Sequence, residues 1–132
     1  MRYLLGTNIV SDLVRNPQGK IAERISKLGE DRVCTSIVVA AELRYGAEKK
    51  GSLRLTAQLE AVLGALEVLP LETPADKTYG MVRTRLEKAG RPIGFNDLLI
   101  ASQALALGYT LVSDNEREFA RVDGLRHENW LH

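Results

Sequence analysis

Residues 94–108 read GFNDLLIASQALALG, and the rest of the chain can be organised around this stretch. Gly94 ends a loop, Asn96 is a typical helix cap, and Asp97 lies in the first turn, where a carboxylate interacts favourably with the helix dipole. The run that follows is almost entirely apolar, which predicts a helix that is buried on most sides. Asp97 therefore borders the core, either as a residue at its rim or as part of a site.

Length and composition predict one domain. The chain has 132 residues, enough for a single domain over residues 1–132 with a substantial core. Hydrophobic residues make up 45% and charged residues 27%, which is the balance of a globular protein. Because the sequence has no signal peptide and no apolar run of about 18 residues, we expect a cytoplasmic protein without membrane contact.

Short apolar segments alternate with helical patterns along the chain. We expect strands at residues 3–5, 32–35, 67–71 and 109–112, with a last strand near residue 125. Helices are expected at 9–14, 21–28, 36–49, 52–66, 74–90 and 96–107, with a last helical turn around Phe119. This alternation predicts an α/β domain of three layers, with a mostly parallel sheet of four to five strands and helices on both faces. The functional crevice of such a sheet lies at the carboxyl ends of its strands.

Two further acids join Asp97 near these strand ends. Glu42 lies in the helix after the second strand among nonpolar neighbours, although Tyr45 or an arginine could pair with it. Asp114 follows the fourth strand directly, beside Asn115. Each acid also has an ordinary reading, since Asp97 could be a first-turn acid worth about 0.3–1 kcal/mol and Asp114 a turn residue. Their convergence on one edge of the sheet favours a shared site.

Clustered carboxylates repel one another, and a hard divalent cation with oxygen ligands is the usual means of keeping them ionised. Mg²⁺ or Mn²⁺ fits that description. A metal held in this way activates water and neutralises charge that develops on a phosphate, so phosphodiester hydrolysis is the chemistry that the acids predict.

The net charge of +1 conceals a basic strip between residues 83 and 91. Arg83, Arg85, Lys88 and Arg91 are opposed there by Glu87 alone. The strip is either a solvated helix face or a set of phosphate contacts, and it is too short to be a strong nucleic-acid signature.

Taken in order along the chain, these motifs resemble the PIN-domain ribonucleases, and more narrowly the VapC-type toxins of bacterial toxin-antitoxin pairs. The resemblance covers essentially the whole chain, and the set of motifs is more specific than any one of them. The matching segments are residues 4–8, 35–36, 41–47, 90–94, 96–101, 111–115, 117–119, 124–125 and 128–130.

The resemblance implies a Mg²⁺- or Mn²⁺-dependent endoribonuclease that cuts structured RNA, often tRNA. A small VapB-like antitoxin would inhibit it, the toxin would form a homodimer or a hetero-oligomer with the antitoxin, and operator DNA would be bound only through the antitoxin. Glu42 and Asp97 match acids of the family, and Asp114 with Asn115 occupies its fourth acidic region. The expected supporting residues are Thr7, Asn8, Ser113 and Asn115, and the expected RNA contacts are Arg83, Arg85 and Arg91.

Gly6 is the serious departure from the family pattern, which reads Asp-Thr-Asn where this chain has Gly-Thr-Asn. The missing aspartate is a principal metal ligand in the family, and Asp12 is too far along the chain to replace it. Losing one ligand removes several orders of magnitude in rate, at about 1.4 kcal/mol per tenfold. We therefore expect a nearly inactive chain, whether the glycine is an engineered substitution or belongs to a natural degenerate toxin.

The sequence also allows two other functions. The chain could be a non-catalytic PIN-like protein that only binds an antitoxin or RNA, and Gly6 is the residue that favours this reading. A flavodoxin-like phosphoacceptor domain shares the alternation of strands and helices, but it needs a lysine on a late strand. Because no lysine follows Lys88, that reading is disfavoured.

Overall fold

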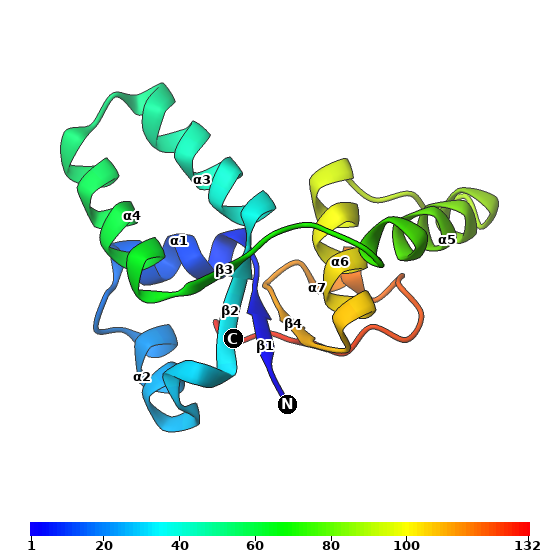
Figure 1. Cartoon of the computed structure of the whole chain (residues 1–132), viewed down its shortest axis with the longest axis horizontal. Coiled ribbons are helices and arrows are strands. Elements are labelled where there is room, and N and C mark those ends of the chain that lie inside the picture. The colour runs from blue at the N-terminus through cyan, green and yellow to red at the C-terminus, as the bar shows by residue number, and fades with distance from the viewer.

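The computed structural model describes all residues from 1 to 132 and shows one five-stranded sheet with helices on both faces (Figure 1). The strands are β1 (Tyr3–Leu5), β2 (Val33–Ser36), β3 (Glu67–Leu69), β4 (Thr110–Val112) and β5 (His127–Glu128). The helices are α1 (Thr7–Arg15), α2 (Lys20–Leu28), α3 (Ile37–Lys50), α4 (Leu53–Ala65), α5 (Ala75–Lys88), α6 (Phe95–Leu107) and α7 (Glu116–Phe119), with a 3₁₀ turn η1 (Glu30–Arg32).

All strand pairs are parallel, and the order across the sheet is β3-β2-β1-β4-β5. The central strand β1 pairs with both neighbours, so that Leu4 lies opposite Cys34 on one side and Leu111 on the other. These three side chains are fully buried. The predicted parallel sheet is therefore confirmed, and its core runs along β1, β2 and β4.

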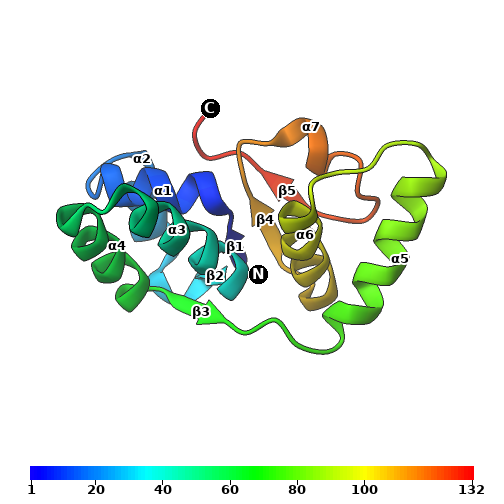
Figure 2. The same cartoon turned by 90° about the horizontal axis from the view of Figure 1, so that it is seen from above.

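The direction of the connections decides which helices cover which face. From β1 the chain moves to β2 and then β3, and it returns to β4 and β5 on the other side of β1. Right-handed crossovers then place α1 to α4 on one face and α5 to α7 on the other, as the view along the strands shows (Figure 2). The connections change direction across the sheet between β1 and β4, and open α/β sheets form their binding crevice at such a point.

Several predicted boundaries shift by a few residues. Helix α6 begins at Phe95 with Gly94 in the cap position, so the prediction that Asn96 caps it was wrong. Helix α1 likewise starts after Gly6, and neither Thr7 nor Asn8 caps it because their side chains bond elsewhere. By contrast, Ser36 caps α3 as the sequence suggests, its hydroxyl accepting the Val38 N–H at 3.0 Å.

The end of β3 and the position of β5 differ from the predictions. The strand expected at 67–71 stops at Leu69, because Pro70 has no N–H to donate to a neighbouring strand. The last strand lies at His127–Glu128, slightly beyond the expected position near residue 125. None of the helices combines the length and the apolar character needed to cross a membrane.

Candidate active site

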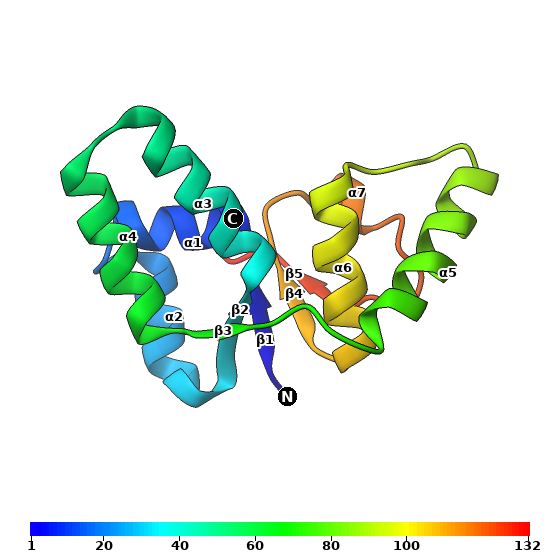
Figure 3. The same cartoon turned by 45° about the horizontal axis from the view of Figure 1, so that its top comes forward.

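A polar cavity of about 150 Å³ opens at the carboxyl ends of β1 and β4, where the connections change direction across the sheet. Helices α3 and α6 lie on either side of these strand ends (Figure 3). The residues that line it come from four separate parts of the chain: Gly6, Thr7, Asn8, Glu42, Asp97, Ile100, Ser113, Asn115 and Phe119. The structure therefore brings Glu42 and Asp97 together, as the sequence predicts for two of the three acids.

Glu42 lies on α3 and is half-buried at the cavity wall. Its Oε1 atom accepts a hydrogen bond of 2.9 Å from the Thr7 hydroxyl in the first turn of α1. Tyr45, which the sequence suggested as a partner, is 66% exposed. Thr7 therefore orients the Glu42 carboxylate, and the bond crosses from the element after β1 to the element after β2.

Asp97 lies in the first turn of α6 and is also half-buried. Asn115 Nδ2 donates to Asp97 Oδ2 at 3.3 Å and to Glu118 Oε2 at 2.7 Å. The other oxygen of Glu118 faces the Gly94 N–H at 3.4 Å. Asn115 thus bridges two carboxylates, one at the start of α6 and one on α7.

The pKa values of Asp97 and Glu118 are shifted in opposite directions. Burial, the hydrogen bond and charge of Glu118, and the charge of Glu42 together raise the pKa of Asp97 to about 7. The pKa of Glu118 is lowered, chiefly by its hydrogen bond with Asp97. As the pH falls through about 7, the pair therefore takes up one proton, which resides on Asp97.

Glu118 was missed by the sequence analysis, although a signal was present. It follows Asn115 by three residues at the start of a helical turn, the spacing at which a cap residue and a glutamate interact. That spacing indicates that Glu118 folds back towards Asn115, and hence towards the end of β4.

Asp114 lies beside the cavity instead of lining it. Its Oδ1 atom accepts a hydrogen bond of 2.7 Å from Asn8 Nδ2. The backbone bends at Asp114, and the Asn115 N–H donates to the Ser113 hydroxyl at 3.0 Å across the bend. Ser113 and Asn115 line the cavity, and Asp114 between them does not. Its role as a metal ligand therefore stays a prediction.

Gly6 forms part of the cavity wall directly after β1. Its backbone, with φ −78° and ψ 177°, is extended and open to any residue. Its N–H donates to the Val112 carbonyl oxygen at 2.8 Å, and an added Cβ would meet the same oxygen at 3.0 Å. A carboxylate at this position thus requires a shift of a few tenths of an ångström and would join Glu42 and Asp97 at one cavity.

The predicted basic strip divides into two parts in the structure. Arg83 donates to Glu87 at 2.9 Å and to the Tyr79 hydroxyl at 3.0 Å, and its guanidinium lies 5.1 Å from the Phe95 ring centroid. Arg85 and Arg91 instead line a second pocket, next to residues that follow α7. The strip is therefore not one continuous surface.

Comparison with known proteins decides the family. The chain matches the PIN domain over residues 3–125. The tRNA(fMet)-specific endonuclease VapC of Shigella flexneri is 37% identical over 131 residues, which cover 98% of both chains. Ribonuclease VapC2 of Haemophilus influenzae is 38% identical over 132 residues and 99% of both chains. The chain belongs to the VapC ribonucleases of the PIN-domain family.

Solved VapC structures share the whole fold. The VapBC2 structure from Rickettsia felis, bound to a DNA fragment from its promoter, superposes with a TM-score of 0.92 at 38% identity, covering 98% of this chain and 99% of that chain. The DNA-bound VapBC structure from Salmonella typhimurium gives 0.88 at 37% identity, covering 98% of both chains. The VapC-type family and the α/β fold predicted from sequence are confirmed.

PIN-domain nucleases depend on divalent metal ions, and the VapC cavity fits such an ion in chemistry but not in ligand number. Its acidic groups are all carboxylates, the donors that hard divalent cations prefer. Burial and then the neighbouring carboxylates, Glu118 before Glu42, raise the pKa of Asp97, and a cation would oppose this effect. Yet no group of three or more acidic, histidine or cysteine side chains is arranged to hold a metal. The cavity lacks a third carboxylate, and Gly6 occupies the position where the family has one.

Proposed function

We propose that this VapC chain is the toxin of a toxin-antitoxin pair and carries the site of a metal-dependent endoribonuclease, strongly attenuated by Gly6. The observation that supports this most is the cavity at the ends of β1 and β4, where Glu42 and Asp97 meet and Gly6 forms the wall. The family membership supplies the reaction class, phosphodiester hydrolysis in RNA.

Some residues of the cavity orient the carboxylates, and the carboxylates themselves would bind the ion. Thr7 fixes Glu42, and Asn115 holds Asp97 and Glu118 towards each other. Glu42 and Asp97 would hold the ion, Mg²⁺ or Mn²⁺, with Glu118 as a further acid nearby. When bound, the ion supplies an activated water and neutralises charge on the phosphate. Asp114 supports the site through Asn8.

Attenuation follows from the missing carboxylate. Without a side chain at Gly6, only two acids line the cavity, and their repulsion is partly relieved by a proton on Asp97. An ion held by an incomplete ligand set binds weakly and must displace that proton. We expect the loss to amount to about three orders of magnitude in rate, at about 1.4 kcal/mol per tenfold.

The partners of this chain are proposed from those of its relatives. The Shigella flexneri relative is named as a tRNA(fMet)-specific endonuclease, and the Rickettsia felis structure holds VapBC2 on promoter DNA. We assign to this chain a structured RNA substrate, most simply a tRNA, and a VapB-like antitoxin that carries any contact with operator DNA. We also assign it a cytoplasmic location and a homodimeric toxin within a hetero-oligomeric complex.

Among the predicted RNA contacts, Arg85 and Arg91 are the stronger candidates. Both are exposed and line a pocket, and neither forms an ion pair. Arg83 is paired with Glu87, so part of its charge is already compensated. We therefore assign contact with the RNA backbone to Arg85 and Arg91 rather than to Arg83.

Restoring the carboxylate tests the proposal. Gly6→Asp is expected to give RNA cleavage with Mg²⁺ or Mn²⁺ that EDTA abolishes, raising the rate by about three orders of magnitude over the parent. The assay is cleavage of total tRNA, with the purified protein free of antitoxin. Gly64→Asp is the matched control, because Gly64 is an exposed residue of α4 with nothing within 4 Å of an added Cβ. Absence of cleavage by Gly6→Asp with either ion would reject the ribonuclease assignment.

Gly6 also favours a second function, that of a non-catalytic PIN-like protein that binds only antitoxin or RNA. The two are distinguished by the same variant and by the genomic reading frame. A natural glycine codon together with an inactive Gly6→Asp protein that still binds RNA would support the binding role.

A further inference from the structure

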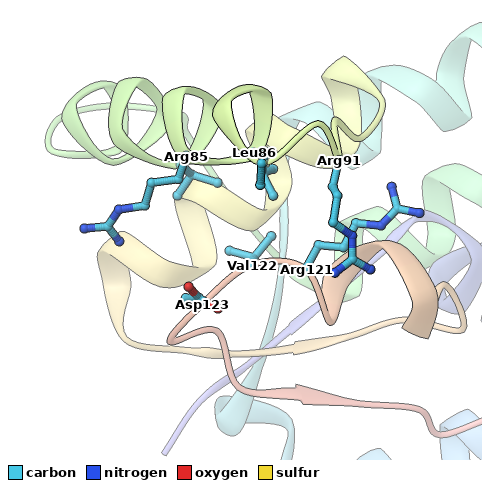
Figure 4. Close-up of a pocket in the computed structure, with 8 residues that line it drawn as sticks. Arg85, Leu86, Arg91, Arg121, Val122 and Asp123 are labelled. Atoms are coloured by element: carbon cyan, nitrogen blue, oxygen red, sulfur yellow. The ribbon is translucent and has the colours of Figure 1, made fainter.

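A second pocket, of about 200 Å³, lies between the carboxyl end of α5 and the segment after α7. Its apolar floor is formed by Val82, Leu86 and Val122, and Figure 4 shows the arginines around it. Arg91 and Arg121 lie together at one end, whereas Arg85 extends to the opposite side. Arg121 is distant in sequence from the basic strip, so the fold adds a cation that the strip lacked.

The arginines of this pocket have no carboxylate partner. The four ion pairs of the chain involve Arg2, Arg24, Arg44 and Arg83 instead. Asp123 is the only acid in the pocket lining, and Figure 4 places it on the side away from Arg91 and Arg121. Two guanidinium groups thus share one end of a pocket without an ion pair, and the charge of Glu118 offsets only part of that of Arg121, so this end favours binding of an anion.

Arg121 is held in place by the backbone. Its Nη1 atom donates to the Pro92 carbonyl oxygen at 2.9 Å, beside Arg91 in the loop before α6. The Arg121 side chain is therefore fixed against the loop that carries Arg91, which keeps the two guanidinium groups at the same end of the pocket.

The same short segment connects this pocket to the acidic cavity. Asn115 and Phe119 line the cavity, and Arg121 and Val122 line the pocket. The loop of residues 92–94 is attached to this segment twice, by Arg121 at Pro92 and by Glu118 at Gly94. The two sites are therefore neighbours with a shared, hydrogen-bonded wall.

We propose that Arg91 and Arg121 bind a backbone phosphate of the RNA substrate, beside the phosphodiester that is cleaved at the acidic cavity. This inference rests on the proposed ribonuclease function. Guanidinium groups bind phosphate oxygens through paired, charge-assisted hydrogen bonds, and phosphate recurs along any RNA regardless of sequence. Binding at the pocket positions the neighbouring linkage, so the subsite contributes to RNA affinity and contributes little to the chemical step.

The test measures RNA binding without cleavage. The parent chain is mixed with a folded tRNA transcript in EDTA, and the dissociation constant is followed as the KCl concentration rises. The variants are Arg91→Gln and Arg121→Gln, each checked for an unchanged melting temperature. Arg126→Gln is the matched control, because Arg126 also donates to a backbone carbonyl, that of Gly108, but at the opposite end of α6.

We expect each pocket variant to bind the tRNA about three- to ten-fold more weakly at low salt, and the slope of log K against log [KCl] to fall by about 0.7–0.9. Arg126→Gln should match the parent. If Arg121→Gln lowers the melting temperature, Arg91→Gln decides, since Arg91 is exposed and its side chain makes no hydrogen bond.

Three results would overturn the subsite: no tRNA binding by the parent, unchanged affinity and slope in Arg91→Gln, or an equal loss in Arg126→Gln. None of them depends on cleavage, so they are separate from failure of the ribonuclease function, which Gly6→Asp decides. In the Gly6→Asp background, Arg91→Gln should raise KM for tRNA and leave kcat unchanged.

Discussion

The acidic cavity and the basic pocket are adjacent groups of like charges, and they are built in opposite ways. In the cavity the carboxylates are half-buried and bonded to Thr7 and Asn115, and burial together with the neighbouring acids raises the pKa of Asp97. In the pocket, Arg91 is exposed and only Arg121 is held by the backbone. The comparison shows that hydrogen bonds fix both acids of the cavity, whereas they fix only one of the two arginines of the pocket.

The largest effect should come from removing the central acid of the cavity. In the Gly6→Asp background, Asp97→Asn is expected to lower kcat for RNA cleavage by about three orders of magnitude, because a ligand at the half-buried position is lost. Asp114→Asn removes the same charge beside the cavity and should cost at most about tenfold. Single-turnover cleavage of tRNA measures both. Equal losses would show that Asp114 is a direct ligand and belongs to the cavity.

The sequence predicted the cavity better than the pocket, for physical reasons. Glu42 and Asp97 were found because parallel strands end at one edge, so residues on the elements that follow must converge. Asp114 was expected with them but lies beside the cavity, because the backbone bends there and the hydrogen bond between Asn115 and Ser113 closes the bend.

The side-chain contacts of the site residues were harder to predict from the sequence than the places of those residues in the fold. Nothing in the sequence pairs Thr7 with Glu42, because the contact joins two helices whose packing is set by the sheet. Arg121 was missed for a related reason: it is isolated in sequence and meets Arg91 only through the fold of the loop onto the segment after α7. The basic strip in the sequence therefore indicated the arginines on one side of the pocket, whereas Arg121 on the other side became apparent only in the tertiary structure.

A smaller effect is expected on folding stability, which should depend on pH through Asp97 in the cavity. The pKa of Asp97 in the folded protein, about 7, exceeds its ordinary value of 3.8, so the folded state binds this proton more tightly than the unfolded state. The contribution of Asp97 to stability is complete below its ordinary pKa and is lost as pH rises towards 7. Between pH 5 and 7.5 the melting temperature of the parent should therefore fall by a few degrees, on the order expected for a small domain.

The matched measurement is the same pH series on Asp97→Asn, which cannot ionise at this position. Its melting temperature should change less over that range and exceed that of the parent at pH 7.5. Added Mg²⁺ or Mn²⁺ should stabilise the parent more at pH 7.5 than at pH 5, because an ion competes with the proton. Parallel pH profiles for the two proteins would show that burial and the neighbouring acids do not perturb Asp97.

The smallest effect is expected from Arg83, and it sharpens the distinction within the basic strip. Arg83 is paired with Glu87 and lies over Phe95, so little free charge is left for a phosphate. Arg83→Gln should change tRNA affinity in EDTA by less than about twofold and leave the salt slope unchanged, whereas Arg91→Gln reduces both. Its melting temperature should fall slightly, since the contacts with Tyr79 and Phe95 are lost. If Arg83→Gln instead weakens binding as much as Arg91→Gln, RNA contacts the whole strip through its net charge, and the pocket has no special role.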